Sequence, residues 1–432
     1  MTTTKASPAK TAGSSRPCNR CKEHEGTIDL RGAESVCKSC FAYYVSSKAI
    51  KRLEALQRET SRNAGKGQNR RPQRYLVGLS LGPSSTALLH VLTENVRQQR
   101  ARGQKTSRFE YVVVHVVDDT SSSPTAGEDL LSPYRAHFPD AELQAVPLGA
   151  ALHLPSIDWT ALPRQNASLL PAQRLADVLE RLPSATSRAD IRRLLVRHLL
   201  IAAATDRGCD ALLLGHSTTS LAELTLSETA KGRGFSLPWL VNDGAAPVPA
   251  SLCSEAQSTA QSPTPLLPMY SPLRELFRKE LHMYLSQTTP PLTSLLSPSS
   301  SSTTSQRSKA GAVVSHRDQS IDDVLARYFG EVEASYPSVV ANVVRTTGKL
   351  ERRAPSQDNR DNGGGSEGEE EEGNGNLCGL CGAALDELGD ERWRGEIGDE
   401  AVVDSIEGEA EDANSRGKKL KLCYGCERST RG

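Results

Sequence analysis

Two stretches decide the fold: YLVGLSLGPSSTALLHVLTENV at residues 75–96 and FEYVVVHVVD at residues 109–118. The apolar run Tyr75–Leu79 predicts a strand, the Gly/Pro/Ser turn predicts a break, and the apolar periodicity from Ser85 to Val96 predicts a helix. The β-branched run Phe109–Asp118 is typical of a strand buried on both faces. Strand, helix and strand at this spacing form a βαβ unit, which predicts a parallel sheet with a right-handed crossover.

The same alternation continues along the chain. Further helices are expected at Asp190–Thr205 (ended by Gly208), Ser220 to about Lys231, Leu273–Leu285 and, for the most part, Ile321–Leu350, and further strands at Cys209–Gly215 and Pro265–Met269. We therefore expect an α/β, Rossmann-like domain of the PP-loop ATPase type at residues 74–287, with an insertion at 120–170.

Other segments flank this domain. They are a disordered lead (1–16), a four-cysteine zinc-knuckle module (17–41), a basic helix and linker (42–73), a Ser/Thr/Pro low-complexity segment (288–318), a helical segment (319–354), an acidic disordered spacer (355–376) and a second four-cysteine module (377–432). There are no internal repeats beyond the cysteine pairs.

The zero net charge of the 432 residues conceals a polarity. Residues 1–73 carry 15 basic and 6 acidic side chains, whereas residues 355–415 carry 3 basic and 19 acidic ones. This asymmetry favours a polyanion as partner at the N-terminal end and a solvated, self-repelling spacer near the other end. Only 37% of residues are hydrophobic, so we expect part of the chain to stay unpacked.

Eight of the ten cysteines form four Cys-x-x-Cys pairs. They are Cys18/Cys21, Cys37/Cys40, Cys378/Cys381 and Cys423/Cys426. The first quartet has the spacing of a tetrahedral zinc site, while 41 residues separate the two pairs of the second. With four thiolates each, both sites would be closed and structural; redox pairs are the alternative. The N-terminus lacks an apolar signal segment and no stretch reaches the length of a membrane span, so the chain is predicted to be cytosolic, with no membrane partner.

The turn between the first strand and helix holds Ser80, Gly82, Ser84 and Ser85. In parallel sheets, ligands bind at the carboxyl ends of strands, where the N–H groups of a helix N-terminus face an anion. Small residues allow close approach of a phosphate, and the hydroxyls add donors. The alternative is a helix start capped by serine.

In its context, this turn resembles the pyrophosphate loop of the ATP-pyrophosphatase superfamily, which usually reads SGGxDS. Leu214–Ser217, Ala222-Glu223 and Lys231–Gly234 resemble the strand-GHNxDDxxET-helix segment of tRNA-thiolating members. Similar matches to their RRxLL and PL…KE segments lie at Arg192–Leu195, Pro272-Leu273 and Lys279-Glu280. The order of these motifs, with a cysteine quartet at each end, resembles the cytoplasmic tRNA 2-thiolation protein 2 family.

The resemblance implies a subunit paired with cytoplasmic tRNA 2-thiolation protein 1 that acts on the wobble uridine of tRNAs for Lys, Glu and Gln. Sulfur would come from a thiocarboxylated ubiquitin-like protein, ubiquitin-related modifier 1. In active members, ATP adenylates the uridine C2 oxygen and sulfur then attacks.

Departures from the active pattern imply a non-catalytic subunit. Leu81 and Ser84 replace the second Gly and the Asp of the loop, and Thr219 and Ser220 replace the acidic pair. The catalytic cysteines would fall near Ala185–Arg188, which has none, so both the carboxylates for magnesium and the thiolate nucleophile are missing. Whether ATP binds is left open. The alternatives are an active adenylating enzyme that uses Ser80, Gly82 and Ser85, and a zinc-dependent protein adaptor without an RNA role.

Basic side chains mark candidate RNA contacts. Those on the N-terminal helix are Lys48, Lys51, Arg52, Arg58 and Arg62, within a stripe that reaches Arg74, and those on the later helix are Arg192 and Arg193. Such stripes neutralise phosphates, although a solvated helix face or pairing with carboxylates is the alternative. His216 is interpreted as a turn residue, and Cys209 and Cys253 as ordinary residues.

Overall fold

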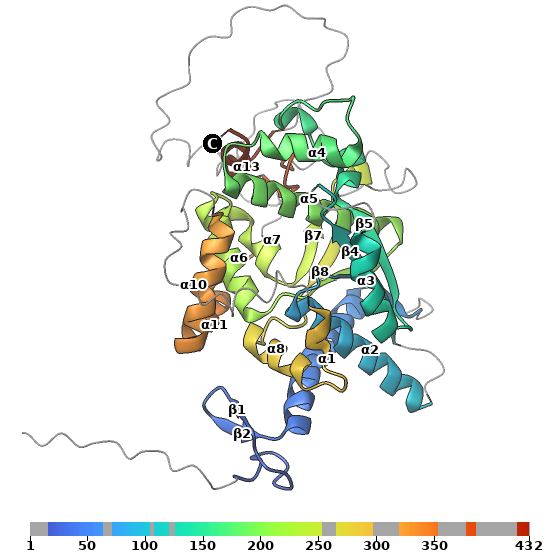
Figure 1. Ribbon diagram of the computed structural model, residues 1–432, viewed down its shortest axis with the longest axis vertical. Coiled ribbons are helices and arrows are strands. Elements are labelled where there is room, and N and C mark those ends of the chain that lie inside the picture. Colours follow the sequence, from blue (N-terminus) through green and yellow to red (C-terminus); the bar gives the residue numbers. More distant parts are fainter. Residues whose placement is uncertain are drawn as a thin grey trace, which may run out of the picture.

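The computed structural model describes residues 16–63, 71–103, 108–120, 126–252, 265–296, 319–352, 377–385 and 421–431. The predicted acidic spacer, nearly all of the predicted disordered lead, residues 297–318 and Cys253 lie outside these ranges. A six-stranded sheet in the order β5-β4-β3-β6-β8-β7 forms the centre of the molecule (Figure 1). Its strands are β3 (Gln73–Gly78), β4 (Phe109–Val117), β5 (Glu142–Pro147), β6 (Ala211–Leu214), β7 (Gly244–Pro247) and β8 (Leu266–Tyr270).

The sheet has the topology of a doubly wound α/β fold. Five strands run parallel, and only the edge strand β7 pairs in the antiparallel sense, with β8. Strand β3 lies between β4 and β6, so the direction in which strands are added reverses there. Ligands bind beyond the carboxyl ends of the strands at such a switch point. The predicted Rossmann-like parallel sheet is therefore confirmed.

Helices cover both faces of the sheet. The α-helices of the described residues are α1 (Lys38–Asn63), α2 (Pro83–Ala101), α3 (Ala126–His137), α4 (Pro171–Glu180), α5 (Ala185–Asp206), α6 (Thr218–Ala230), α7 (Leu237–Val241), α8 (Arg278–Ser286), α10 (Ile321–Ser335), α11 (Pro337–Thr347) and α13 (Tyr424–Arg431). Tyr75 and Val77 of β3 pack in the cluster that contains the apolar side of α2, whereas Leu76 packs with Ile201 of α5. Period-two alternation thus assigns successive β3 side chains to opposite layers.

Two sequence-based boundaries are wrong. Most of the expected insertion at 120–170 is integral, because it contains α3 and β5, and β5 pairs with β4. Only one residue of β5 is fully buried, so it lacks the continuous apolar run that reveals a central strand. The helix expected from Leu273 begins at Arg278, after a turn. The prediction that 321–350 is mostly helical is confirmed; the segment consists of two helices that meet at Tyr336, because Pro337 cannot continue the hydrogen-bond ladder of α10.

The two cysteine modules lie at opposite ends of the molecule (Figure 1). The N-terminal one, with the hairpin β1 (Ile28–Leu30) and β2 (Glu34–Val36), leads into α1. Arg31 Nε donates to Glu280 Oε1 of α8 over 2.7 Å, which fixes this module against the α/β domain. The C-terminal one shares a hydrophobic cluster with α4 and α5. No helix within the described ranges combines the length and apolar character that crossing a membrane requires.

Candidate functional site: a closed loop between two cysteine clusters

The loop between β3 and α2 lies at the switch point, where the resemblance predicts a nucleotide. Leu81, in the place of a glycine, has φ +59°, the left-handed region that L-residues other than glycine rarely adopt, and its side chain is buried in the core. A Cβ on Gly215, just beyond β6, would lie 2.5 Å from Ser85 Cα. The turn after β6 is therefore in backbone contact with the start of α2. This close approach explains why residue 215, in the Gly-His-Ser motif, is a glycine.

The loop hydroxyls bind one another. Ser85 Oγ lies 3.1 Å from Ser80 Oγ, accepts from the Ser80 N–H at 3.2 Å and donates to Gly82 O at 3.2 Å. The N-cap of α2 is Gly82, without a side-chain cap, so the serine-capped helix start considered above does not form. The nucleotide-binding role of Ser80, Gly82, Ser84 and Ser85 stays a prediction.

A helix from the C-terminal half contacts Thr219, one of the two residues at which the resemblance places an acidic pair. Thr219 Oγ1 donates to Glu333 Oε2 of α10 over 2.7 Å, and Thr219 is fully buried. Ser220 forms a capping box with Ser217 at the start of α6. These two hydroxyls serve helix capping and packing, and sequence reasoning missed Glu333 because its partners are remote in the chain.

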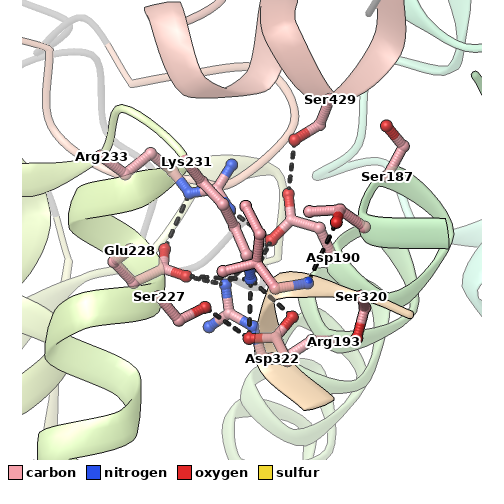
Figure 2. Close-up of polar contacts among 12 residues, drawn as sticks. Ser187, Asp190, Arg193, Ser227, Glu228, Lys231, Arg233, Ser320, Asp322 and Ser429 are labelled. Atoms are coloured by element: carbon pink, nitrogen blue, oxygen red, sulfur yellow. Dashed lines mark hydrogen bonds and ion pairs between the residues drawn. The ribbon is translucent and has the colours of Figure 1, made fainter. Parts of the chain in front are cut away.

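A buried ionic cluster joins α5, α6 and α10 (Figure 2). Asp190 and Glu228 are fully buried, and both contact Arg193, Lys231 and Arg233. Lys231 also pairs with Asp322 at 2.8 Å. Burial raises the pKa of Asp190, yet the three cations around it hold that pKa well below its usual range.

Sequence reasoning missed this cluster, although Lys231 and Arg233 belong to the Lys231–Gly234 segment that carries part of the family resemblance. The available signal was a carboxylate, Asp190, at the start of an otherwise strongly apolar helix. Arg192 and Arg193 are both paired: Arg192 Nε lies 3.3 Å from Asp118 Oδ2, just after β4. The structure thus supplies carboxylate partners for both arginines, and their RNA contact stays a prediction.

Both cysteine quartets assemble as the spacing predicts. The four sulfurs of Cys18, Cys21, Cys37 and Cys40 lie within 4.8 Å of one another, and so do those of Cys378, Cys381, Cys423 and Cys426. In each, the first sulfur accepts the N–H of the third cysteine at 3.3 Å. Four thiolates at this separation fit one tetrahedral metal ion such as zinc, with no open coordination position. The C-terminal quartet is fully buried, whereas Cys21 and Cys40 are half-buried.

The basic helix α1 has two different faces. Lys48 Nζ lies 3.1 Å from Glu275 Oε2, and Arg52 Nε donates to Asp243 Oδ2 over 2.6 Å, so these cations fix α1 to the α/β domain. Lys51 and Arg58 instead face solvent, and Tyr43, earlier on the same helix, is 69% exposed. Arg62 falls within α1, but its side chain is outside the described part.

A cavity of about 830 Å³ lies between the start of α5, the turn after α6 and α13. Hydroxyls of Ser184, Thr186, Ser187, Thr229 and Ser429 line it, with Lys231 and Arg428. This is where the catalytic cysteines of active thiolases would fall in the sequence. Phe235 and Ile321 add apolar surface, and none of the lining residues is a cysteine that could act as a sulfur nucleophile.

Comparison with known proteins identifies the family. The model of the family "Cytoplasmic tRNA 2-thiolation protein 2" matches residues 320–428, from α10 to α13. A protein of that name from Sclerotinia sclerotiorum is 37% identical over 78% of this chain and 83% of its own. Others from Phaeosphaeria nodorum and Pyrenophora tritici-repentis are 34% and 32% identical, over 97% and 96% of this chain and 95% of each relative. The chain belongs to the cytoplasmic tRNA 2-thiolation protein 2 family.

The family assignment confirms the resemblance that the motif order indicated, and the relatives' names agree with the predicted cytoplasmic localisation. Among solved structures, the chain is similar to the U34-tRNA thiolase NcsA from Methanococcus maripaludis with its [4Fe-4S] cluster. That similarity covers 76% of this chain and 86% of the thiolase, with 15% sequence identity and a TM-score of 0.45.

Proposed function

We propose that this family member is the non-catalytic, tRNA-binding and scaffolding subunit of the cytosolic wobble-uridine 2-thiolation complex. Its partner would be cytoplasmic tRNA 2-thiolation protein 1, with ubiquitin-related modifier 1 as the sulfur donor and tRNAs for Lys, Glu and Gln as substrates. The observation that carries the non-catalytic assignment is the bond between Thr219 and Glu333, which occupies the position of the acidic pair.

Two further features support the absence of catalysis. Adenylation requires carboxylates that hold magnesium beside the ATP phosphates, and the loop offers Leu81 and Ser84 where active enzymes have Gly and Asp. Sulfur transfer requires an accessible thiolate, and the cysteines of the C-terminal quartet are at most 8% exposed. Closed sites of four cysteines serve architecture.

The outer face of α1 supports the tRNA-binding role. Lys51 and Arg58 are exposed, and Arg58 lies 4.0 Å from Glu54 of its own helix, whereas Lys48 and Arg52 pair with carboxylates of the α/β domain. An exposed tyrosine on the same helix adds a surface on which a base can stack. Exposed cations and an exposed aromatic side chain on one helix are typical of contacts with nucleic acid backbones and unpaired bases.

Reconstitution with tRNA, ATP and the thiocarboxylated donor tests the proposal. Nucleoside mass spectrometry would compare this chain alone, its partner alone and both together. We expect 2-thiouridine only when both chains are present. Thiolation or tRNA-dependent pyrophosphate release by this chain alone would establish the active-enzyme alternative, and full thiolation by the partner alone would leave the adaptor alternative.

A further inference from the structure

The C-terminal cysteine cluster has a buried arginine against one of its sulfurs. Arg233 Nη1 lies 3.8 Å from Cys426 Sγ, in hydrogen-bonding geometry, and Arg233 is 1% exposed. Glu228 Oε2 accepts from Arg233 Nε at 2.8 Å, and Asp190 accepts from Nη2, so the guanidinium is held in place on two sides (Figure 2). A Cβ on Gly425 would lie 2.5 Å from Arg233 Cγ, which shows how closely α13 packs on this side chain.

A second arginine beside the cluster lacks a counter-charge. Arg197 lines a small pocket together with Arg233 and Cys381. Within the described ranges it has no carboxylate partner and no hydrogen bond. Burial and the neighbouring Arg193 lower the pKa of Arg197 to about 10. Arg197 is half-buried, and an anion placed beside such a cation would stabilise it.

The ionic cluster cannot supply that anion, because its own charges balance. Asp190, Glu228 and Asp322 carry three negative charges, and Arg193, Lys231 and Arg233 carry three positive ones. A divalent metal bound by four thiolates, in contrast, has a net charge of −2. Arg197, the cation left over from this balance, therefore lies beside the C-terminal cysteine cluster, which becomes anionic when metal binds.

We propose that Arg197 and Arg233 are the outer-shell partners of a metal–tetrathiolate centre at the C-terminal quartet. Arg233 donates an N–H to the Cys426 thiolate, and Arg197 supplies the counter-charge beside Cys381. Metal binding at this centre and the docking of α13 onto α5 are then coupled, since the buried Arg233 contacts both Cys426 of α13 and Asp190 of α5.

The docking contacts support this coupling. Ser429 Oγ of α13 donates to Asp190 Oδ2 over 2.7 Å, and His198 Nε2 lies 3.0 Å from Leu380 O. The segments 377–385 and 421–431 are thus joined to α5 and to each other at the same place. The N-terminal centre differs, because its sulfurs contact the Ser39 hydroxyl at 3.2 Å and a ring nitrogen of His24 at 3.7 Å, near solvent.

Zinc affinity of the full-length chain tests the proposal, measured by competition with a chromophoric chelator. Cys18→Ser/Cys21→Ser serves as background, so that the C-terminal quartet is the complete centre. We expect Arg197→Met and Arg233→Met each to weaken zinc binding about 10–100-fold, the range typical of outer-shell partners. Arg233→Lys should recover part of the loss. The matched control is Arg278→Met, which removes an ion pair with Glu223 that contacts no cysteine.

A stability measurement keeps the test decisive if Arg233→Met folds poorly. Arg197 has no carboxylate to leave unpaired, so Arg197→Met should leave the melting temperature of the metal-free chain unchanged or higher, while lowering that of the zinc-loaded chain. In the cobalt-loaded chain, Arg233→Met should shift the sulfur-to-cobalt charge-transfer band. The proposal is overturned if zinc affinity stays within about twofold of the Arg278→Met control, or if Arg197→Met destabilises the metal-free and zinc-loaded chains equally.

Discussion

Thr219 Oγ1 donates a 2.7 Å hydrogen bond to Glu333 Oε2, across 114 residues of sequence. The other carboxylate oxygen accepts the Lys279 N–H at 3.0 Å, so the side chain of Glu333 joins the N-terminal turns of α6 and α8 to α10. Glu333 is 4% exposed. A buried carboxylate that accepts two hydrogen bonds from helix starts stabilises both helices.

Glu333→Gln should therefore destabilise the chain by about 1–3 kcal/mol. The glutamine amide has only one acceptor oxygen, so either the Thr219 hydroxyl or the Lys279 N–H would lose its acceptor and face an NH₂ group instead. Equilibrium urea denaturation measures the change. Glu331→Gln is the control, since Glu331 is exposed on the same helix. We expect that variant to stay within about 0.5 kcal/mol of the parent. Equal effects of the two substitutions would contradict a structural role for the bond.

At position 81, a glycine variant should be more stable than an alanine variant. Leu81→Ala removes the buried side chain but keeps the left-handed backbone, which costs an alanine about 1 kcal/mol. Leu81→Gly removes the same side chain and that cost, so it should be the more stable variant by about 1 kcal/mol. Urea denaturation of both variants checks the order. An alanine variant at least as stable as the glycine variant would show that the backbone is not left-handed at this residue.

Charge reversal on the outer face of α1 should weaken tRNA binding. Lys51→Glu/Arg58→Glu is expected to reduce affinity and to lower the slope of log K against log salt by about 2, because two phosphate contacts are lost. Filter binding over a range of salt concentrations measures both.

The matched control for this prediction is Arg345→Glu/Lys349→Glu, which makes the same charge change at exposed positions on and just after α11. It should bind tRNA like the parent. A salt slope that is the same for both double variants would remove α1 from the RNA-binding surface. Lys48 and Arg52 are unsuitable for this test, since neutralising them disturbs the junction with Glu275 and Asp243.

His216 should make the fold less stable in mild acid. Burial and two nearby arginines lower its pKa from 6.5 to about 4. The folded state therefore binds fewer protons than the unfolded state, so this contribution is complete above about pH 6.5 and is lost as the pH falls toward 4. At pH 5 the loss should be about 2 kcal/mol. His216→Asn should flatten the pH dependence of urea denaturation between pH 6.5 and 5, and an unchanged profile would contradict the shifted pKa.

The sequence predicted the sheet because its central strands are continuous apolar runs. Phe109–Asp118 and Cys209–Gly215 are buried on both faces, and such runs can be recognised without knowing their neighbours. It missed β5, a half-exposed edge strand whose few apolar residues are ambiguous when considered alone. It also extended one helix too far toward the N-terminus, at Leu273, where apolar periodicity continues through a turn.

The candidate site, too, contains features that local sequence patterns predict and features that they do not. Cysteine spacing predicted that both quartets assemble into clusters, because each Cys-x-x-Cys pair fixes two sulfurs locally. The partners of Arg233, Glu333 and Arg52 depended on contacts across 43, 114 and 191 residues, which no local pattern encodes.

What the sequence alone determined is the type of fold, the two cysteine clusters, and the residues that stand where active enzymes have catalytic ones. Only the tertiary structure decided which basic residues of α1 pair with the α/β domain, and that Glu333 of α10 bonds to Thr219. Only the tertiary structure placed Arg233 against the sulfur of Cys426, and Arg197 in the same small pocket as Cys381. The physical reason is that local periodicity depends on neighbours in sequence, whereas the pairing of a charge depends on which remote group is buried beside it.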